Sequence, residues 1–179
     1  SPIDDVPDAM LAAATGFEAT TDPAVLADVD AIFLCVPTPF DAAKTPVLDY
    51  VETAAHTVGR HLRRGQLVIL QSTTYPGTTT EIVQPILEGE SGLRAGVDFH
   101  VAYSPERVDP ANTTWTLANT PKVCGGITSA CGEMARVLLT AILAVAPPKP
   151  PNQLTAYISA HAQKLTVSAN SSPTATARD

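Results

Sequence analysis

The amino-acid sequence predicts an α/β fold, built on a mostly parallel, doubly wound sheet with flanking helices. Strand-like and helix-like segments alternate along the chain, which is the order that a parallel sheet requires. Two strand-like segments, residues 30–36 and 66–70, are largely apolar, as expected for strands that are buried on both faces. Each ends abruptly in a turn that contains Pro, Ser or Thr, and these turns mark where the strands stop.

The first elements that we expect are short. Residues Asp8 to Ala14 favour a helix, and residues Phe17 to Thr20 favour a strand. The next helix should begin at Asp22-Pro23, because Asp is a good N-cap and Pro is well placed at the first helical position.

Two longer helices carry stronger signals. Asp49-x-x-Glu52 and Thr78-x-x-Glu81 both match the capping box that starts many helices. Each box precedes apolar residues at helical spacing, which indicates one face turned toward the core. These core-facing residues are Val51, Ala54, Ala55, Val58 and Leu62 in the first helix, and Ile82, Val83, Ile86 and Leu87 in the second.

The second half of the chain adds a strand and a helix before its character changes. A strand is expected at residues 99–103. Lys122-Val123-Cys124 leads into Gly125-Gly126, and Thr128 should cap a helix that runs to about Leu143. The remainder, residues 144–179, is rich in Pro, Ser, Thr and Ala. We expect it to be largely disordered, apart from a weak helix signal over residues 152–165. The chain is therefore divided into residues 1–143 and 144–179.

Composition excludes several classes of function. The 179 residues carry a net charge of −7 with no basic run, which argues against a nucleic-acid or anionic-membrane surface. No apolar stretch approaches the ~20 residues of a membrane-spanning helix, and no signal peptide is visible. Three cysteines without metal-like spacing favour reduced, buried thiols in a cytoplasmic protein, and the four scattered histidines indicate no metal site.

Three strand ends carry the candidate functional residues. They are Val36-Pro37-Thr38-Pro39, Ser72-Thr73 and Ser104-Pro105-Glu106, and in a parallel sheet they lie on one edge, where they can surround one ligand. The Ser72 and Thr73 hydroxyls can donate to a phosphate, a ribose or a carboxamide. Gly77 allows a ligand to approach the backbone closely. The alternative is that Ser72, Thr73 and Thr78 only cap the helix that follows.

Glu106 and Arg107 have two interpretations each. A Glu after Ser-Pro at a strand end can act as a general base, or it can be a loop carboxylate that faces water. Arg107 can pair with Glu106 or contact an anionic substrate.

Taken together, five motifs resemble those of the NAD-dependent nucleotide-sugar dehydrogenases. In chain order they are Ser-Pro-Ile at 1–3, Cys-Val-Pro-Thr-Pro at 35–39, Ser-Thr-Thr-Tyr-Pro-Gly-Thr-Thr at 72–79, Tyr-Ser-Pro-Glu-Arg-Val-Asp-Pro at 103–110 and Pro-Lys-Val-x-Gly-Gly at 121–126. The most similar subgroup is that of the UDP-N-acetylglucosamine and UDP-N-acetylmannosamine 6-dehydrogenases, relatives of UDP-glucose dehydrogenase. The resemblance covers about residues 1–143.

The resemblance implies a Rossmann-like fold and a reaction. Such enzymes oxidise the C6 alcohol of a UDP-sugar to a carboxylate by two hydride transfers to NAD, through a cysteine thiohemiacetal and a thioester. By the same resemblance Val36, Pro37 and Thr38 would lie along the NAD. Thr73 would lie near the nicotinamide, and Glu106 would face the substrate.

The departures from the family imply a partial domain. No G-x-G-x-x-G occurs, so we expect the first βαβ strands and their pyrophosphate-binding loop to be missing. Cys124 and Cys131 do not stand in the context of the family's catalytic cysteine, and the helix through which these enzymes usually dimerise has no counterpart.

Three interpretations follow from this comparison. The chain is part of a nucleotide-sugar dehydrogenase and inactive alone, or a non-catalytic nucleotide-binding module, or a non-functional truncated product.

Overall fold

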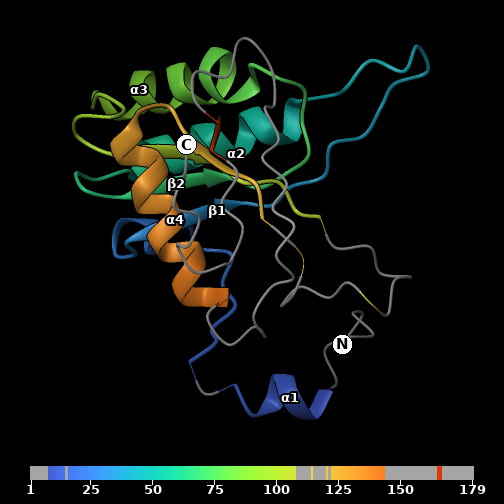
Figure 1. Cartoon of the computed structure of the whole chain (residues 1–179), viewed down its shortest axis with the longest axis vertical. Coiled ribbons are helices and arrows are strands. Elements are labelled where there is room, and N and C mark those ends of the chain that lie inside the picture. Colours follow the sequence, from blue (N-terminus) through green and yellow to red (C-terminus); the bar gives the residue numbers. More distant parts are fainter. Residues whose placement is uncertain are drawn as a thin grey trace, which may run out of the picture.

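Figure 1 shows a computed structural model of the chain. It describes residues 8–14, 16–107, 114, 120, 122–143 and 165–166.

The centre of the molecule is a five-stranded sheet in the order β1-β2-β3-β4-β5. The five strands are β1 (Ala31–Leu34), β2 (Leu67–Leu70), β3 (His100–Tyr103), β4 (Cys124–Gly126) and β5 (Leu165–Thr166). The first three strands are parallel, whereas β4 runs antiparallel to β3 and β5 antiparallel to β4. The expected mostly parallel sheet is confirmed, with an antiparallel margin. The carboxyl ends of β1, β2 and β3 therefore lie at the same edge.

Helices cover both faces of this sheet, as a doubly wound fold requires (Figure 1). On one face lie α2 (Asp49–His61) and α3 (Gln84–Ser91), and α3 is preceded by the π-helical turn η2 (Thr79–Val83). On the other face lies α4 (Ser129–Leu143), which packs against β4 and β3.

The core has two layers, one on each side of the sheet. Alternate residues of β2 divide between them, Val68 and Leu70 on the α2–α3 side and Leu67 and Ile69 on the α4 side. All four are buried, so β2 is apolar because it is covered on both faces. The larger layer includes Val51, Ala55 and Val58 of α2, Val83 of η2, Leu87 of α3, and Phe99 and Val101. The smaller layer includes Ala102, Cys124, Ala135 and Leu139.

The expected apolar helix faces are confirmed, but the capping boxes are not formed. The α2 helix is preceded by Leu48, which makes no side-chain cap. Thr78 already has helical dihedral angles, and its hydroxyl donates to the Tyr75 carbonyl at 2.8 Å. Thr128, in contrast, caps α4 as expected, since its Oγ1 accepts from the Cys131 N–H at 3.2 Å.

The segments before β1 fit the expectations only in part. The helix α1 (Asp8–Ala12) forms, and the Asp22 side chain caps η1 (Pro23–Ala27), which is a 3-10 helix. The strand expected at Phe17–Thr20 is wrong. Phe17 is 65% exposed, and no strand among the described residues lies beside this segment. A strand needs a partner for its backbone groups, and apolar residues alone do not supply one.

The strand β1 was expected to be buried on both faces, but only Ile32 and Leu34 are buried, and Ala31 and Phe33 are half-buried. The expectations for the tail fall outside the described residues, except that Leu165 and Thr166 form β5. In the described part of the chain, no helix combines the length and apolar character needed to cross a bilayer.

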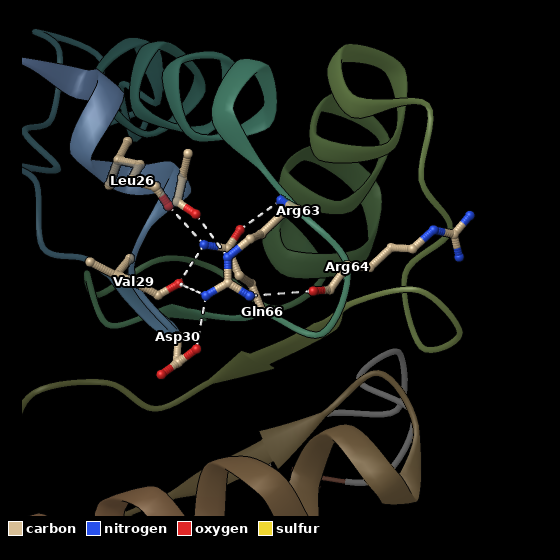
Figure 2. A network of polar contacts seen from close by, with 7 residues as sticks. Leu26, Val29, Asp30, Arg63, Arg64 and Gln66 are labelled. Carbon is tan, nitrogen blue, oxygen red and sulfur yellow. Dashed lines mark hydrogen bonds and ion pairs between the residues drawn. The ribbon is translucent and has the colours of Figure 1, made fainter.

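The amino-terminal edge of β1 and β2 is closed by a polar network (Figure 2). The fully buried Gln66 side chain donates to the Leu26 and Val29 carbonyls at 2.7 and 2.6 Å, and accepts from the Arg63 N–H. The Arg63 guanidinium donates to the Val29 carbonyl and pairs with Asp30 at 2.8 Å. This network fixes η1 and the start of β1 against the turn before β2.

Candidate functional site

The three strand ends singled out in the sequence come together at the carboxyl edge of the sheet. The Val36 N–H, just after β1, donates to Ser72 Oγ, just after β2, at 2.8 Å. After β3, the Ser104 N–H donates to the Leu70 carbonyl at 3.0 Å, and the Glu106 N–H donates to the Gln71 carbonyl at 3.2 Å. Hydrogen bonds therefore join β1 to β2 and β2 to β3 beyond the strands themselves.

The Ser72 hydroxyl makes hydrogen bonds within the protein. It accepts from the Val36 N–H and lies within donating distance of two carbonyls, Val36 at 2.7 Å and Leu34 at 3.2 Å. A hydroxyl has one proton to donate, and the residue is only 8% exposed. Ser72 thus fixes the backbone of residues 34–36, which positions the loop that follows β1.

Thr38 and Thr73 differ from Ser72 in this respect. Among the described residues, neither hydroxyl has a hydrogen-bond partner, and Thr73 is exposed. Ser104 Oγ, at the end of β3, is buried and also lacks a partner among those residues. Of these, the Thr38 and Thr73 hydroxyls are not buried and are available to a ligand, whereas Ser104 is only 1% exposed.

The Glu106 carboxylate is held by several donors. Its Oε2 accepts from Gln71 Nε2 at 2.9 Å and lies 2.6 Å from Lys122 Nζ, and its Oε1 accepts from the Arg107 N–H at 2.7 Å. Lys122 lies two residues before β4, and its side chain is 8% exposed, against 37% for Glu106. The carboxylate therefore has a fixed orientation at the edge.

The partner of Glu106 was not foreseen from the sequence. The sequence allows Arg107 as its ion-pair partner, but Arg107 contacts the carboxylate through its backbone N–H, and Lys122 supplies the charge. A Lys in an otherwise apolar run before Gly125-Gly126 was the available signal, because lysines are rarely buried unless paired.

The cysteines are free, and two of them are not poised as nucleophiles. Cys124 and Cys131 are buried, as expected, but Cys35 at the end of β1 is exposed. Partial burial raises the pKa of the Cys35 thiol, the Glu106 carboxylate raises it further, and the Lys122 ammonium opposes this. Burial raises the pKa of Cys124 to about 11. Both thiols are therefore mostly protonated at neutral pH.

The turn after β2 is shaped by Gly77. Its φ of 99° is disfavoured for residues with a side chain, and a Cβ there would lie 2.7 Å from Glu81 Oε1. This close approach is to the chain's own carboxylate, which accounts for the glycine without a ligand. In the described residues, no group of three or more His, Cys, Asp or Glu side chains is arranged to hold a metal ion.

A mixed sheet whose first three strands are parallel and whose two faces are covered by helices defines a Rossmann-like α/β domain. The chain belongs to the UDP-glucose/GDP-mannose dehydrogenase family, whose NAD binding domain matches residues 4–143.

Several named relatives are similar to this chain. The UDP-N-acetyl-D-glucosamine 6-dehydrogenase of Pseudomonas aeruginosa is 40% identical over 108 residues, which is 60% of this chain and 26% of the relative. The crystal structure of an NDP-N-acetyl-D-galactosaminuronic acid dehydrogenase from Methanosarcina mazei Go1 has a TM-score of 0.69 at 36% identity, covering 76% of this chain and 30% of that one. A ternary complex of GDP-mannose dehydrogenase from Pseudomonas aeruginosa has a TM-score of 0.63 at 31% identity, covering 73% and 30%. The chain spans about a quarter of the length of the curated relatives it matches.

The residues present at the edge fit part of a dinucleotide. The Thr38 and Thr73 hydroxyls, which have no partner in the described ranges, are of a kind that can hydrogen-bond to hydroxyl, carboxamide and phosphate groups such as those of NAD. The glycine-rich loop that usually receives the pyrophosphate has no equivalent in the 179 residues.

Proposed function

We propose that this chain forms part of the NAD site of a nucleotide-sugar 6-dehydrogenase that oxidises the C6 alcohol of a UDP-sugar to a carboxylate. The observation that carries the proposal is the junction of three strand ends, held by Ser72 and Glu106. At this junction the Thr38 and Thr73 hydroxyls have no partner within the described part of the chain. Membership of the family and the names of the relatives support the chemistry.

Each residue of the edge has a proposed role. Val36, Pro37 and Thr38 lie along the cofactor, and Ser72 keeps their backbone in place. Thr73 lies near the nicotinamide, and Glu106 and Arg107 face the substrate. When bound, NAD accepts a hydride. Glu106 holds or moves a proton near the reacting centre, and its fixed orientation supports that role.

For these 179 residues alone, we propose NAD binding without turnover. The sequence holds no G-x-G-x-x-G, and the raised pKa values of Cys35 and Cys124 disfavour either thiol as the nucleophile of the reaction. We also propose a cytoplasmic protein without a nucleic-acid partner, which its free cysteines and its net charge of −7 support.

Calorimetry with NAD tests binding, and NADH absorbance with UDP-N-acetylhexosamines tests turnover. We expect saturable heat from the wild type, weaker binding by Thr73→Ala, and no NADH production. Thr53→Ala, on the exposed surface of α2, is the matched control and should bind as the wild type does. A wild-type chain that is folded by circular dichroism but gives no saturable heat would contradict the proposed site. Turnover that depends on Glu106 would contradict the inactivity.

A further inference from the structure

Lys122 reaches the site from the segment before β4, which is not one of the three strand ends after β1, β2 and β3. It lies 16 residues after Glu106, two residues before the antiparallel strand β4, and its Nζ reaches Glu106 Oε2 at 2.6 Å. Because the lysine side chain is almost wholly buried, its charge requires an anion nearby. Glu106 supplies that anion from the end of β3.

The charges of this pair reach a third element. Cys35 follows β1, and the Glu106 carboxylate raises the pKa of its thiol while the Lys122 ammonium lowers it. Among the described residues, the Glu106 carboxylate also accepts from the neutral Gln71 side chain and from the Arg107 N–H. The pair therefore affects the electrostatic potential at the end of β1, where the cofactor is proposed to lie.

We propose that Lys122 is the positioning residue of Glu106. The Lys122 ammonium holds the Glu106 carboxylate in one orientation and offsets the negative charge of that carboxylate at the cofactor edge. This inference rests on the NAD site proposed above. It has a specific consequence, since the nicotinamide ring is positively charged in NAD⁺ and neutral in NADH. A carboxylate without its ammonium would attract the oxidised ring and leave the reduced ring unaffected. Lys122 thereby limits the preference of the site for NAD⁺.

The first test uses Cys35 as a reporter and needs no cofactor. The full chain is alkylated with iodoacetamide, and the Cys35 peptide is followed by mass spectrometry across a range of pH. Lys122→Met should raise the pKa of Cys35 and slow its alkylation near neutral pH, by about threefold for a shift of about half a unit. Glu106→Gln should accelerate it, and the double variant should return toward the wild type.

The controls separate charge from disruption of the fold. Lys122→Arg keeps the charge and should restore the wild-type profile, and Lys44→Met, at an exposed loop lysine, should leave it unchanged. If Lys122→Met fails to fold, Glu106→Gln still tests the same ion pair, because it removes the opposite charge. Profiles that do not move in opposite directions for the two charge-removing variants would overturn the inference.

The second test measures the dissociation constants of NAD⁺ and NADH for the same variants by calorimetry. We expect Lys122→Met to change their ratio about threefold in favour of NAD⁺, and Lys122→Arg to restore it. A merely structural role would weaken both cofactors equally, so an unchanged ratio with measurable binding would overturn the inference. Absence of binding by the folded wild type would instead contradict the proposed NAD site, while the Cys35 profiles would still report on the ion pair.

Discussion

Ser72 and Thr73 are adjacent hydroxyl residues with opposite surroundings. The Ser72 hydroxyl bonds to both backbone groups of Val36, whereas the Thr73 hydroxyl has no partner among the described residues. Ser72→Ala leaves the part-buried Val36 N–H without its acceptor, so we expect the free energy of unfolding to fall by about 1–3 kcal/mol. Thr73→Ala should change it by less than about 0.5 kcal/mol. Urea unfolding of the two variants measures both values.

The order of the two variants should be reversed for NAD affinity, with the larger loss in Thr73→Ala. If Thr73 contacts the nicotinamide part of NAD, Thr73→Ala loses affinity without losing stability. A result in which Thr73→Ala destabilises the chain as much as Ser72→Ala would contradict this division of roles.

At the scale of elements, β4 and α4 pack so closely at Gly126 that a side chain there has no room. A Cβ added to Gly126 in β4 would lie 2.1 Å from the backbone nitrogen of Gly132 in α4. The contact is backbone to backbone, so no side chain can move aside. We therefore expect Gly126→Ala to lower the free energy of unfolding by about 3 kcal/mol or more.

Gly89→Ala in α3 is the matched control for this prediction. A Cβ at Gly89 meets nothing within 4 Å, and alanine favours a helix over glycine by about 1 kcal/mol. Urea unfolding should show a gain for Gly89→Ala and a large loss for Gly126→Ala. A neutral Gly126→Ala would mean that β4 and α4 are less closely packed than in this structure.

For the whole molecule, the two edges of the parallel strands have different characters. At the amino-terminal edge, the Gln66 and Arg63 side chains donate hydrogen bonds to backbone carbonyls, and Arg63 also pairs with Asp30. At the carboxyl edge, the hydroxyls of Thr38 and Thr73 remain without partners among the described residues. One edge thus holds the strands together while the other is suited to binding, which is the usual division in open α/β sheets.

The sequence predicted the features whose signal lies within a short stretch of the chain. It did not predict the features that depend on residues distant in the sequence. The strand β2 and the face of α2 were predicted because their burial follows from periodicity within a dozen residues. The strand at Phe17–Thr20 was wrong because pairing depends on a distant neighbour. The edge was predicted from three strand ends, but the roles of Ser72 and Lys122 were not, because their partners Val36 and Glu106 are remote in sequence.

The stability of the whole fold should decrease in acid, in part because of Asp98, which precedes β3. A hydrogen bond from the Arg94 N–H is the main cause that holds the pKa of Asp98 below its ordinary value, and the Arg64 guanidinium lowers it further. A carboxyl whose pKa is lowered by folding stabilises the protein fully above its unfolded pKa of about 3.9. That contribution is lost as pH falls through the lower folded value.

Urea unfolding of the wild type and Asp98→Asn between about pH 7 and pH 2.5 measures this contribution. The amide keeps the size and an acceptor but cannot ionise, so the variant should be less stable at neutral pH and should approach the wild type in acid. Arg64→Met should remove only part of the effect, because the Arg94 backbone donor remains the larger cause. Parallel curves for the wild type and Asp98→Asn across this range would show that Asp98 does not contribute to the acid sensitivity of the fold.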